Sequence, residues 1–341
     1  MPEAQDHGTR RSMRIGLIGA GAVAPFHVRA ASVLAGAELA AVCDIDESAA
    51  RRAAHLAPGA RVFTDHRRML EDDAVDAVIV NTPHALHLPI AIEAAEAGKH
   101  VLVEKPMATS VEDCDRIAAA CASAGVALTV GHIQHFLPDK TAAHALIASG
   151  ELGAVQLVRD NRSTDYRPGT RSPWFFSREV AGGGALFNIG AHCLDRSLWF
   201  GGARASEISA SVANRFGSPV ETDGVLRLRL ENGVGIAIAV VSDPPTRSDS
   251  LTVVCEQGVV EADPRAGTTV RIDGRTRVLH APTEHDIQTG FTAQLADFLQ
   301  VIDGGTPAVP LEHARHVVEL ILASYRSAET GTTSILGRVP A

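Results

Sequence analysis

One segment, residues 14–24, constrains the fold more than any other part of this 341-residue chain. It reads RIGLIGAGAVA: an apolar run that predicts a strand, then a G-x-G-x-x-A pattern, then the start of a predicted helix. The first glycine, Gly19, permits a tight turn, and the second, Gly21, lets a pyrophosphate approach the backbone at the helix N-terminus. With a strand before it and a helix after it, the pattern indicates a dinucleotide-binding turn and not merely a tight connection.

An acidic residue follows the second predicted strand. Asp44 lies about 25 residues after Gly19, the spacing expected in a dinucleotide-binding βαβ unit. A carboxylate at this place can accept hydrogen bonds from both adenosine ribose hydroxyls and would repel a 2′-phosphate. The next residues are Ile45 and Asp46, so no arginine follows directly. The sequence therefore favours NAD over NADP.

The first part of the chain alternates between predicted strands and helices, which is typical of βαβ units around a parallel sheet. The predicted strands are residues 14–18, 38–42, 75–80, 100–103 and 126–130. We therefore expect an α/β Rossmann domain, with a doubly wound parallel sheet, over residues 13–135. Residues 1–12 are polar and are expected to form a disordered tail.

The pattern changes after about residue 150. Short predicted strands follow one another, separated by turn signals such as Asn-Gly and Asp-Gly that are typical of hairpins. These strands are residues 154–162, 207–215, 224–230, 234–241, 250–254, 259–262 and 268–272. A helix to about residue 199 interrupts them, and helices near 289–303 and 311–329 close the chain. An α+β domain with an antiparallel sheet is expected over residues 136–341.

Lysine is rare in this chain. Only three of its 31 basic residues are lysines, and one of them, Lys105, lies in the segment GKHVLVEKP. At the carboxyl end of a parallel strand, its ammonium group would point into the crevice where such sheets bind ligands. There it can donate to a substrate hydroxyl and stabilise a developing alkoxide. Pro106 fixes the chain direction after it, and a cis bond is possible at this position.

The segment GGGALFNIGAHCLD, residues 182–195, carries a third signal. On a helix, Asn188 and His192 are four residues apart and share one face. Histidine has a pKa near neutrality and is the usual general base for a hydroxyl proton. A buried structural histidine is the alternative, and the two preceding signals favour the catalytic role.

Together these motifs resemble the Gfo/Idh/MocA oxidoreductases, a family that includes glucose–fructose oxidoreductase and inositol dehydrogenase. The resemblance extends from about Met13 to Thr333 and rests on GLIGAGAVA, Asp44, NTPHALHLPIAIEAAEAGKHVLVEKPMA and GGGALFNIGAHCLD. It implies a Rossmann domain and a C-terminal domain with a large open antiparallel sheet that binds substrate on one side and mediates oligomerisation. It also implies NAD(P)-linked oxidation or reduction of a sugar-like alcohol.

The resemblance further implies roles for individual residues. Lys105 is expected to reach the reacting hydroxyl, and His192 matches the catalytic histidine. Cofactor contacts are expected from Gly19, Gly21, Ala22, Val23, Asp44, Ile45, Asn81, Thr82, Pro83, His84, His87, Glu104 and Lys105.

Two positions depart from the family pattern. Asn188 stands where inositol-dehydrogenase-like members carry Asp, so it is expected to orient the substrate or the imidazole ring without taking a proton. His135 stands where many members carry Arg; it is kept as a substrate-binding candidate, without a role in binding phosphate or carboxylate.

A predicted loop supplies further substrate-binding candidates. Tyr166, Arg171 and Trp174 offer a ring platform and polar contacts for a sugar. Three His-x-x-His pairs also occur, but no Cys or Glu completes a metal-ligating set, so no metal site is expected. These pairs are His84/His87, His132/His135 and His313/His316.

The composition excludes several partners. Asp+Glu total 40 against 31 Lys+Arg, and the net charge of −9 disfavours nucleic acid and a polybasic membrane contact. No apolar run approaches the ~20 residues that span a bilayer, and the first twelve residues lack the apolar region of a secretory signal. The five cysteines form no C-x-x-C pair. A cytoplasmic protein is expected, and the resemblance implies a homodimer or homotetramer built through the C-terminal sheet.

These observations predict an NAD-dependent dehydrogenase that oxidises a secondary hydroxyl of a cyclic polyol, sugar or sugar derivative. Hydride is expected to pass to nicotinamide and the proton to His192, while Lys105 stabilises the alkoxide. Two alternatives remain: a glycosidase that retains NAD and oxidises its substrate transiently, and a non-catalytic NAD-binding sensor. The presence of both Lys105 and His192 argues against the sensor.

Overall fold

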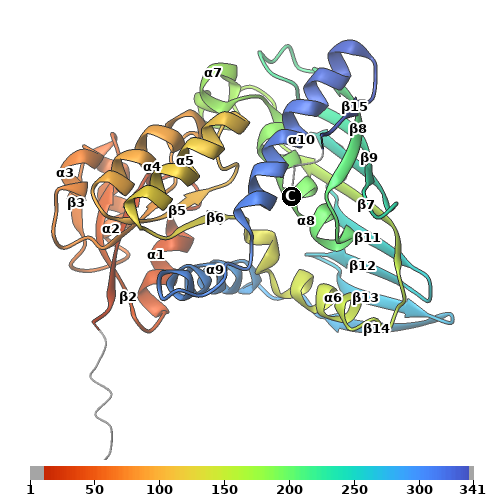
Figure 1. Cartoon of the computed structure of the whole chain (residues 1–341), viewed down its shortest axis with the longest axis horizontal. Helices are drawn as coiled ribbons and strands as arrows, with labels where there is room; N and C mark the ends of the chain where they lie inside the picture. Colours follow the sequence, from red (N-terminus) through yellow and green to blue (C-terminus); the bar gives the residue numbers. More distant parts are fainter. Residues whose placement is uncertain (1–10, 338–341) are drawn as a thin grey trace, which may run out of the picture.

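The computed structural model describes residues 11–337, which form two sheets with helices around and between them (Figure 1). Most of the expected disordered tail, up to residue 10, lies outside the described residues. Arg11, near its end, pairs with Asp76 at 3.2 Å. Within residues 11–337, no helix combines the length and apolar character that a membrane span requires.

The N-terminal sheet has six parallel strands in the order β3-β2-β1-β4-β5-β6, which is the predicted doubly wound arrangement. Five strands match the predicted ones, and the short β3 was not predicted. The strands are β1 (Met13–Ile18), β2 (Ala37–Cys43), β3 (Arg61–Phe63), β4 (Ala77–Val80), β5 (His100–Glu104) and β6 (Leu128–Gly131). Their interiors are almost wholly apolar, because helices cover both faces of the sheet.

The helices of this domain begin and end where the sequence supplies caps. Before α5, the Ser110 hydroxyl accepts a hydrogen bond from the backbone N–H of Asp113 at 3.1 Å, and after it Gly125 adopts a left-handed conformation. Before α2, the Asp46 side chain accepts in the same way from Ser48 at 2.9 Å. The helices are α1 (Ala24–Val33), α2 (Glu47–Ala54), α3 (His66–Leu70), α4 (His87–Glu96) and α5 (Val111–Ala124).

The C-terminal sheet has nine strands in the order β14-β13-β12-β11-β7-β10-β9-β8-β15. Strands β14 and β15 were not predicted. The strands are β7 (Val155–Thr164), β8 (Ala205–Ala213), β9 (Asp223–Leu230), β10 (Gly235–Ser242), β11 (Asp249–Cys255), β12 (Val259–Asp263), β13 (Gly267–Ile272), β14 (Arg275–His280) and β15 (Ser334–Ile335).

The expected antiparallel pairing is corrected at one place, because β7 and β10 run parallel. Strands β10 and β11 flank β7, and the short connection 243–248 reverses the chain between them. Two consecutive strands of opposite direction that enclose a third strand must leave it parallel to one of them. The sheet is therefore mixed and largely antiparallel.

One face of this sheet packs on helices and the other is open. Along β9, the leucines point into the core, while the residues between them are exposed, as expected for a half-buried strand. The buried set is Leu226, Leu228 and Leu230, and the exposed set is Val225, Arg227 and Arg229. The covering helices are α8 (Ala191–Gly201) and α10 (Leu311–Thr330).

Two helices from the last third of the chain join the domains. In α9 (Asp286–Ile302), Phe291 and Phe298 belong to the same apolar core as Leu17 of β1. Helix α10 lies between the two sheets in Figure 1 and contributes Val318 to the N-terminal core and Ile321 to the C-terminal core. The predicted division at residues 135/136 stays a prediction, and these helices bring the two parts into contact.

Candidate active site

The glycine turn between β1 and α1 forms as the sequence predicts. Gly19 has a φ of +99°, and a Cβ there would lie 2.2 Å from the Asn81 carbonyl oxygen, so no side chain fits. A Cβ on Gly21 would meet nothing within 4 Å. The first glycine is thus required by packing, whereas the second leaves open space at the start of α1, where helix N–H groups attract an anion.

Asp44 lies beside this turn at the end of β2. One carboxylate oxygen accepts from the backbone N–H of Ala20 at 2.7 Å, and the other accepts from that of Asp46 at 2.9 Å. The neighbouring Ile45 is 95% exposed. The structure therefore places the carboxylate of Asp44, predicted to bind the ribose, next to the turn predicted to bind the pyrophosphate. The solvent-exposed side chain of Ile45 lies beside it.

The loop after β4 closes the other side of the turn. The Asn81 side-chain amide donates to the Gly19 carbonyl at 3.0 Å, which ties the two segments together. The Thr82 hydroxyl is buried and has no hydrogen-bond partner. Because buried polar groups are nearly always paired, an orphaned hydroxyl beside an open glycine turn fits a site that a dinucleotide completes. The residues present therefore suit NAD.

The two histidines of this loop have partners within the protein. His84 Nδ1 lies 2.7 Å from the Ala181 carbonyl, and its ring meets Trp174 edge-on at 5.0 Å. His87 is fully buried, with its nitrogens 3.0 Å from the carbonyls of Pro106 and Thr82. Burial lowers the pKa of both imidazoles. These contacts anchor the loop after β4. Direct contact of His84 and His87 with the cofactor stays a prediction.

Glu104 and Lys105 follow β5, and the Lys105–Pro106 bond is cis. The Glu104 carboxylate accepts from His27 of α1 at 2.8 Å and from the Lys105 backbone N–H at 3.2 Å. Burial acts to raise the pKa of Glu104, but the His27 hydrogen bond and the Lys105 charge hold it below its usual value. His27, which was not predicted, therefore fixes the carboxylate beside Lys105.

Lys105 reaches across from the N-terminal domain to the C-terminal one. Its Nζ donates to the Asn188 carbonyl at 2.9 Å and to the Asn188 side-chain oxygen at 3.0 Å. Burial lowers the pKa of Lys105 to about 7, and the charges of Arg162 and Arg171 act in the same direction. The Lys105 side chain can therefore exchange between its charged ammonium and neutral amine forms near neutral pH.

The glycine cluster before Asn188 is shaped by two residues distant in sequence. Glu221 accepts from the backbone N–H groups of Gly184 at 2.9 Å and Leu186 at 3.0 Å, and from the Tyr325 hydroxyl at 2.7 Å. A Cβ on Gly183 would lie 2.0 Å from that hydroxyl oxygen. Glu221 and Tyr325 were not predicted, because nothing near them in the sequence marks the contact.

Asn188 and His192 follow on the same helical segment. A π-helical turn over Leu186–Gly190 leads into α8, so the predicted continuous helix is widened where Asn188 lies. His192 is half-buried, and its Nδ1 has no hydrogen-bond partner. Burial, followed by the charges of Lys105 and Arg162, lowers the pKa of His192 well below its usual value. The imidazole is neutral at physiological pH and can accept a proton.

The predicted substrate loop is only partly open. The Tyr166 ring is fully buried and its hydroxyl donates to the Phe175 carbonyl at 3.1 Å, which corrects the expectation of an open ring platform at this residue. Arg171 donates to the carbonyl of Asp165 at 2.6 Å, and its guanidinium lies 5.1 Å from the Tyr166 ring. Trp174 is half-buried against His84 and remains the candidate for contact with a sugar ring.

Burial raises the pKa of the Tyr166 hydroxyl, and a hydrogen bond with the Asn188 side chain works in the opposite direction. The Tyr166 hydroxyl therefore lies close to the Asn188 side chain.

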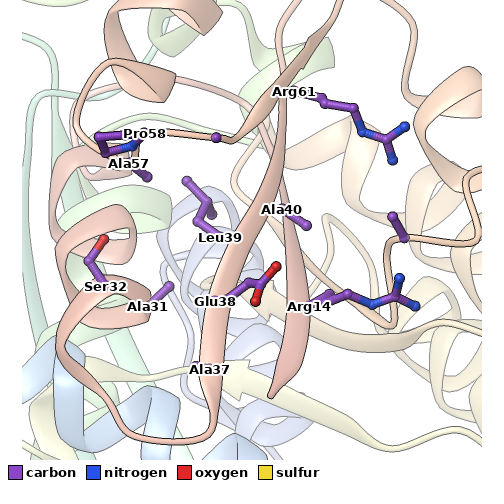
Figure 2. Close-up of a pocket in the computed structure, with 12 residues that line it drawn as sticks. Arg14, Ala31, Ser32, Ala37, Glu38, Leu39, Ala40, Ala57, Pro58 and Arg61 are labelled. Carbon is purple, nitrogen blue, oxygen red and sulfur yellow. The ribbon is translucent and has the colours of Figure 1, made fainter. Parts of the chain in front are cut away.

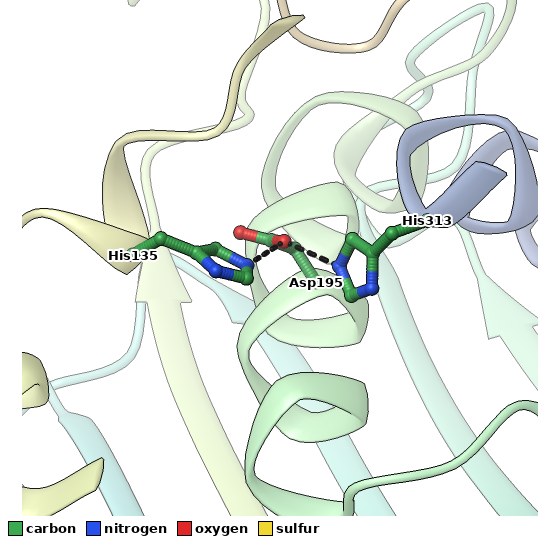
Figure 3. A group of neighbouring side chains, drawn as sticks. All are labelled: His135, Asp195 and His313. Atoms are coloured by element: carbon green, nitrogen blue, oxygen red, sulfur yellow. Dashed lines mark hydrogen bonds and ion pairs between the residues drawn. The ribbon is translucent and has the colours of Figure 1, made fainter. Parts of the chain in front are cut away.

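His135 belongs to a different group from the other substrate-binding candidates. Its ring stacks on Trp199 at 4.2 Å, and its Nε2 lies 2.8 Å from Asp195 of α8 (Figure 3). His313 of α10 contacts the same carboxylate oxygen at 2.8 Å. The sequence interpretation found no third ligand for these His-x-x-His pairs; the structure supplies Asp195, which is distant from both in sequence.

A surface hollow of about 510 Å³ lies at the opposite edge of the N-terminal sheet (Figure 2). It is lined by residues at the amino ends of β1, β2 and β3, among them Arg14, Glu38 and Arg61. Arg14 pairs with Asp76 at 2.8 Å. Because parallel sheets bind ligands at the carboxyl ends of their strands, this hollow is separate from the candidate active site.

Two family models match the chain. Residues 13–132 match a model described as an oxidoreductase family with an NAD-binding Rossmann fold. Residues 141–261 match a model described as the GFO/IDH/MocA C-terminal domain.

Individual proteins similar to this chain are also oxidoreductases. The chain is 31% identical over 270 residues to inositol 2-dehydrogenase 2 of Saccharopolyspora erythraea, covering 77% of each chain. It is 33% identical to a 1-carboxy-3-chloro-3,4-dihydroxycyclohexa-1,5-diene dehydrogenase of Comamonas testosteroni, covering 65% of this chain and 56% of that enzyme. Among solved structures, GenD2 from gentamicin A biosynthesis, in complex with NAD, has a TM-score of 0.86 at 28% identity and covers 99% of this chain and 100% of that one.

Proposed function

This chain belongs to the Gfo/Idh/MocA oxidoreductase family, and on that premise we propose that it oxidises a secondary hydroxyl of a cyclic polyol, sugar or sugar derivative. Its family binds NAD and acts on hydroxyl groups. The inositol 2-dehydrogenase relative supports a ring-shaped polyol or sugar as the substrate class.

The observation that carries the proposal is the pairing of Lys105 with Asn188, four residues before His192. Lys105 comes from the carboxyl edge of the NAD-binding sheet, and Asn188 and His192 come from the segment that begins α8. A positively charged hydrogen-bond donor and a neutral imidazole therefore lie near each other between the two domains. Oxidation of an alcohol needs this combination, because the hydroxyl must lose a proton while negative charge develops on its oxygen.

Each residue has a distinct part in the reaction. The neutral imidazole of His192 takes the hydroxyl proton, and the Lys105 ammonium group donates to the same oxygen and stabilises the alkoxide. The Asn188 amide, held by Lys105, orients the substrate. Bound NAD supplies the acceptor for the hydride that leaves the carbinol carbon.

The cofactor would be held by residues of the N-terminal domain. Gly21 and the N-terminus of α1 accommodate the pyrophosphate, with Ala22 and Val23 in the same turn. The Asp44 carboxylate would accept from the adenosine ribose, beside the exposed Ile45.

The open face of the nine-stranded sheet supports assembly into a homodimer or homotetramer. Apolar side chains such as Val225 and Val241 are exposed on this sheet, with 59% and 38% of their surface accessible. The oligomeric state is checked by light scattering of the purified protein.

The experiment that tests the proposed function follows NADH absorbance during incubation of the protein and NAD with inositols, free sugars and nucleotide sugars. We expect NADH formation with at least one ring polyol or sugar, and a lower rate with NADP. Cleavage of a glycoside without net NADH would favour the NAD-retaining glycosidase. Tight NAD binding with no turnover of any compound would favour a sensor.

A further inference from the structure

Three imidazoles and one carboxylate converge where the two domains meet. His132 directly follows β6, and His135 ends the short helical turn that comes next (η2, Ile133–His135). Asp195 lies on α8 and His313 in the first turn of α10. Figure 3 shows His135 and His313 approaching Asp195 from opposite sides on three separate ribbons.

The contacts among these groups are short. His135 Nε2 and His313 Nε2 both lie 2.8 Å from the same oxygen of Asp195, Oδ1. The ligating atoms of these three residues all fall within 4.8 Å of one another. His132 Nδ1 faces the second oxygen, Oδ2, at 3.3 Å.

Hydrogen bonding alone leaves this cluster incomplete. His132 and Asp195 are both 0% exposed. Nevertheless, both ring nitrogens of His132 and the Oδ2 atom of Asp195 lack a hydrogen-bond partner. Meanwhile two imidazoles share Oδ1. Because buried polar groups are nearly always paired, unpaired nitrogen and oxygen atoms in a fully buried site indicate that the cluster as a whole lacks a partner.

We propose that His135, Asp195 and His313 bind one Zn²⁺ ion. Imidazole and carboxylate are its usual ligands, and with three protein ligands a water molecule would fill the fourth tetrahedral position. Ligands about 2.0–2.1 Å from a tetrahedral ion lie roughly 3.3 Å apart, and the ligating atoms of these three residues already lie within 4.8 Å of one another.

Packing around the cluster holds the rings in place. His135 stacks on Trp199 at 4.2 Å with an interplanar angle of 25°. The His313 ring stands edge-on to His135 at 5.2 Å and to His132 at 6.0 Å. Rings fixed in this way need little reorganisation to bind a metal ion.

The proposed ion has a structural role. It would join the end of β6 to α8 and α10, and Asp195 lies three residues after His192 on α8. The ion therefore fixes the helix that carries the proposed general base against the NAD-binding domain. This inference stands apart from the substrate proposed above, because it is tested by metal binding and not by turnover.

The test starts from the full-length protein stripped of metal with a chelator and then titrated with Zn²⁺ against a chromophoric indicator. We expect one equivalent to bind, and Co²⁺ in its place to give the visible absorption of tetrahedral coordination. Mg²⁺ and Ca²⁺, which require more oxygen ligands, are expected not to compete.

Two ligand variants and one matched control locate the site. His313→Ala and Asp195→Asn should weaken Zn²⁺ binding at least about tenfold. His313 suits this test because its side chain is 18% exposed, so its replacement should fold. The control is His144→Ala, because His144 stacks on Trp199 at 4.1 Å without belonging to the cluster; its Zn²⁺ affinity should equal that of the wild type.

Thermal unfolding gives a second readout. Saturating Zn²⁺ should raise the Tm of the stripped wild-type protein by at least about 3 °C, because a ligand that binds only the folded state stabilises it. It should leave the Tm of His313→Ala unchanged. Absence of stoichiometric Zn²⁺ binding, or equal binding by His313→Ala and the wild type, would overturn the proposal.

Discussion

Lys105 and Asn188 share two hydrogen bonds across the boundary between the two domains: the lysine ammonium group donates to both the backbone and the side-chain oxygen of the asparagine, at 2.9 and 3.0 Å. Neither acceptor carries a full negative charge. Burial lowers the pKa of Lys105 to about 7, although the Glu104 carboxylate acts to raise it. The proposed oxyanion-stabilising group is therefore poised to lose its charge near neutral pH.

This relationship predicts the pH dependence of the reaction. Only the charged form of Lys105 stabilises an alkoxide, so kcat/KM should fall as the pH rises above about 7. No rising limb is expected near pH 6.5, because burial and the charges of Lys105 and Arg162 hold the pKa of His192 well below its usual value. The measurement is kcat/KM between pH 5.5 and pH 9.5, values chosen to bracket the pKa of about 7.

The Asn188→Asp variant provides the matched comparison. A carboxylate at this position favours the charged ammonium group, so the pKa of Lys105 rises and the falling limb should move to higher pH. If activity instead rises through pH 7 in the wild type, Lys105 acts as the base and its assigned role is wrong.

A second prediction separates the two glycines of the dinucleotide turn. Gly19→Ala forces a Cβ into the Asn81 carbonyl at a φ of +99° and should destabilise the protein by about 2–3 kcal/mol. Gly21→Ala meets no atom, so its stability should stay within about 0.5 kcal/mol of the wild type while NAD binding weakens. Urea unfolding and calorimetric NAD titration check both; unchanged NAD affinity in Gly21→Ala would place the pyrophosphate elsewhere.

A third prediction concerns Asp44. Asp44→Asn keeps an oxygen that can accept from the Ala20 N–H but removes the charge. Loss of charge-assisted hydrogen bonds to the ribose should cost about 1.5–3 kcal/mol, which raises the Kd for NAD roughly 10- to 100-fold. Discrimination against NADP should shrink as well, because the repulsion of a 2′-phosphate is lost. An unaltered Kd for NAD would refute the assignment.

A fourth prediction tests the support beneath Asn188. Tyr325→Phe removes the hydroxyl that donates to the buried Glu221 carboxylate at 2.7 Å. We expect stability to fall by about 1–3 kcal/mol and kcat to decrease, because Glu221 holds the glycine turn that precedes Asn188. NAD affinity should not change, since both residues belong to the C-terminal domain. An altered NAD affinity with normal kcat would contradict this role.

Much of the fold follows from local patterns in the sequence. Gly19 and Gly21 mark the first βα turn because their conformational and steric needs are local, and Lys105 is found from its place at a strand end. A helical segment carrying Asn188 and His192 is likewise predicted, although its widening into a π-helical turn at Asn188 is not. The doubly wound sheet emerges from the alternation of strands and helices.

Other features depend on contacts between segments far apart in the chain. His27 fixes Glu104, and Tyr325 fixes Glu221, through partners that no local pattern reveals. The burial of Tyr166 beneath its own loop is equally invisible in a sequence where the surrounding residues are polar. The parallel pairing of β7 with β10 arises from the order in which strands enter the sheet, which hairpin signals do not encode.

The most direct test of the account compares Lys105→Met and His192→Ala with the wild type, using a substrate found in the NADH screen. Both variants should lower kcat at least about 100-fold, because each removes a group that acts on the reacting hydroxyl. Their affinities for NAD should remain near that of the wild type, because the proposed cofactor contacts of Gly21 and Asp44 are intact. Full activity in either variant would contradict the central claim that Lys105 and His192 carry the reaction.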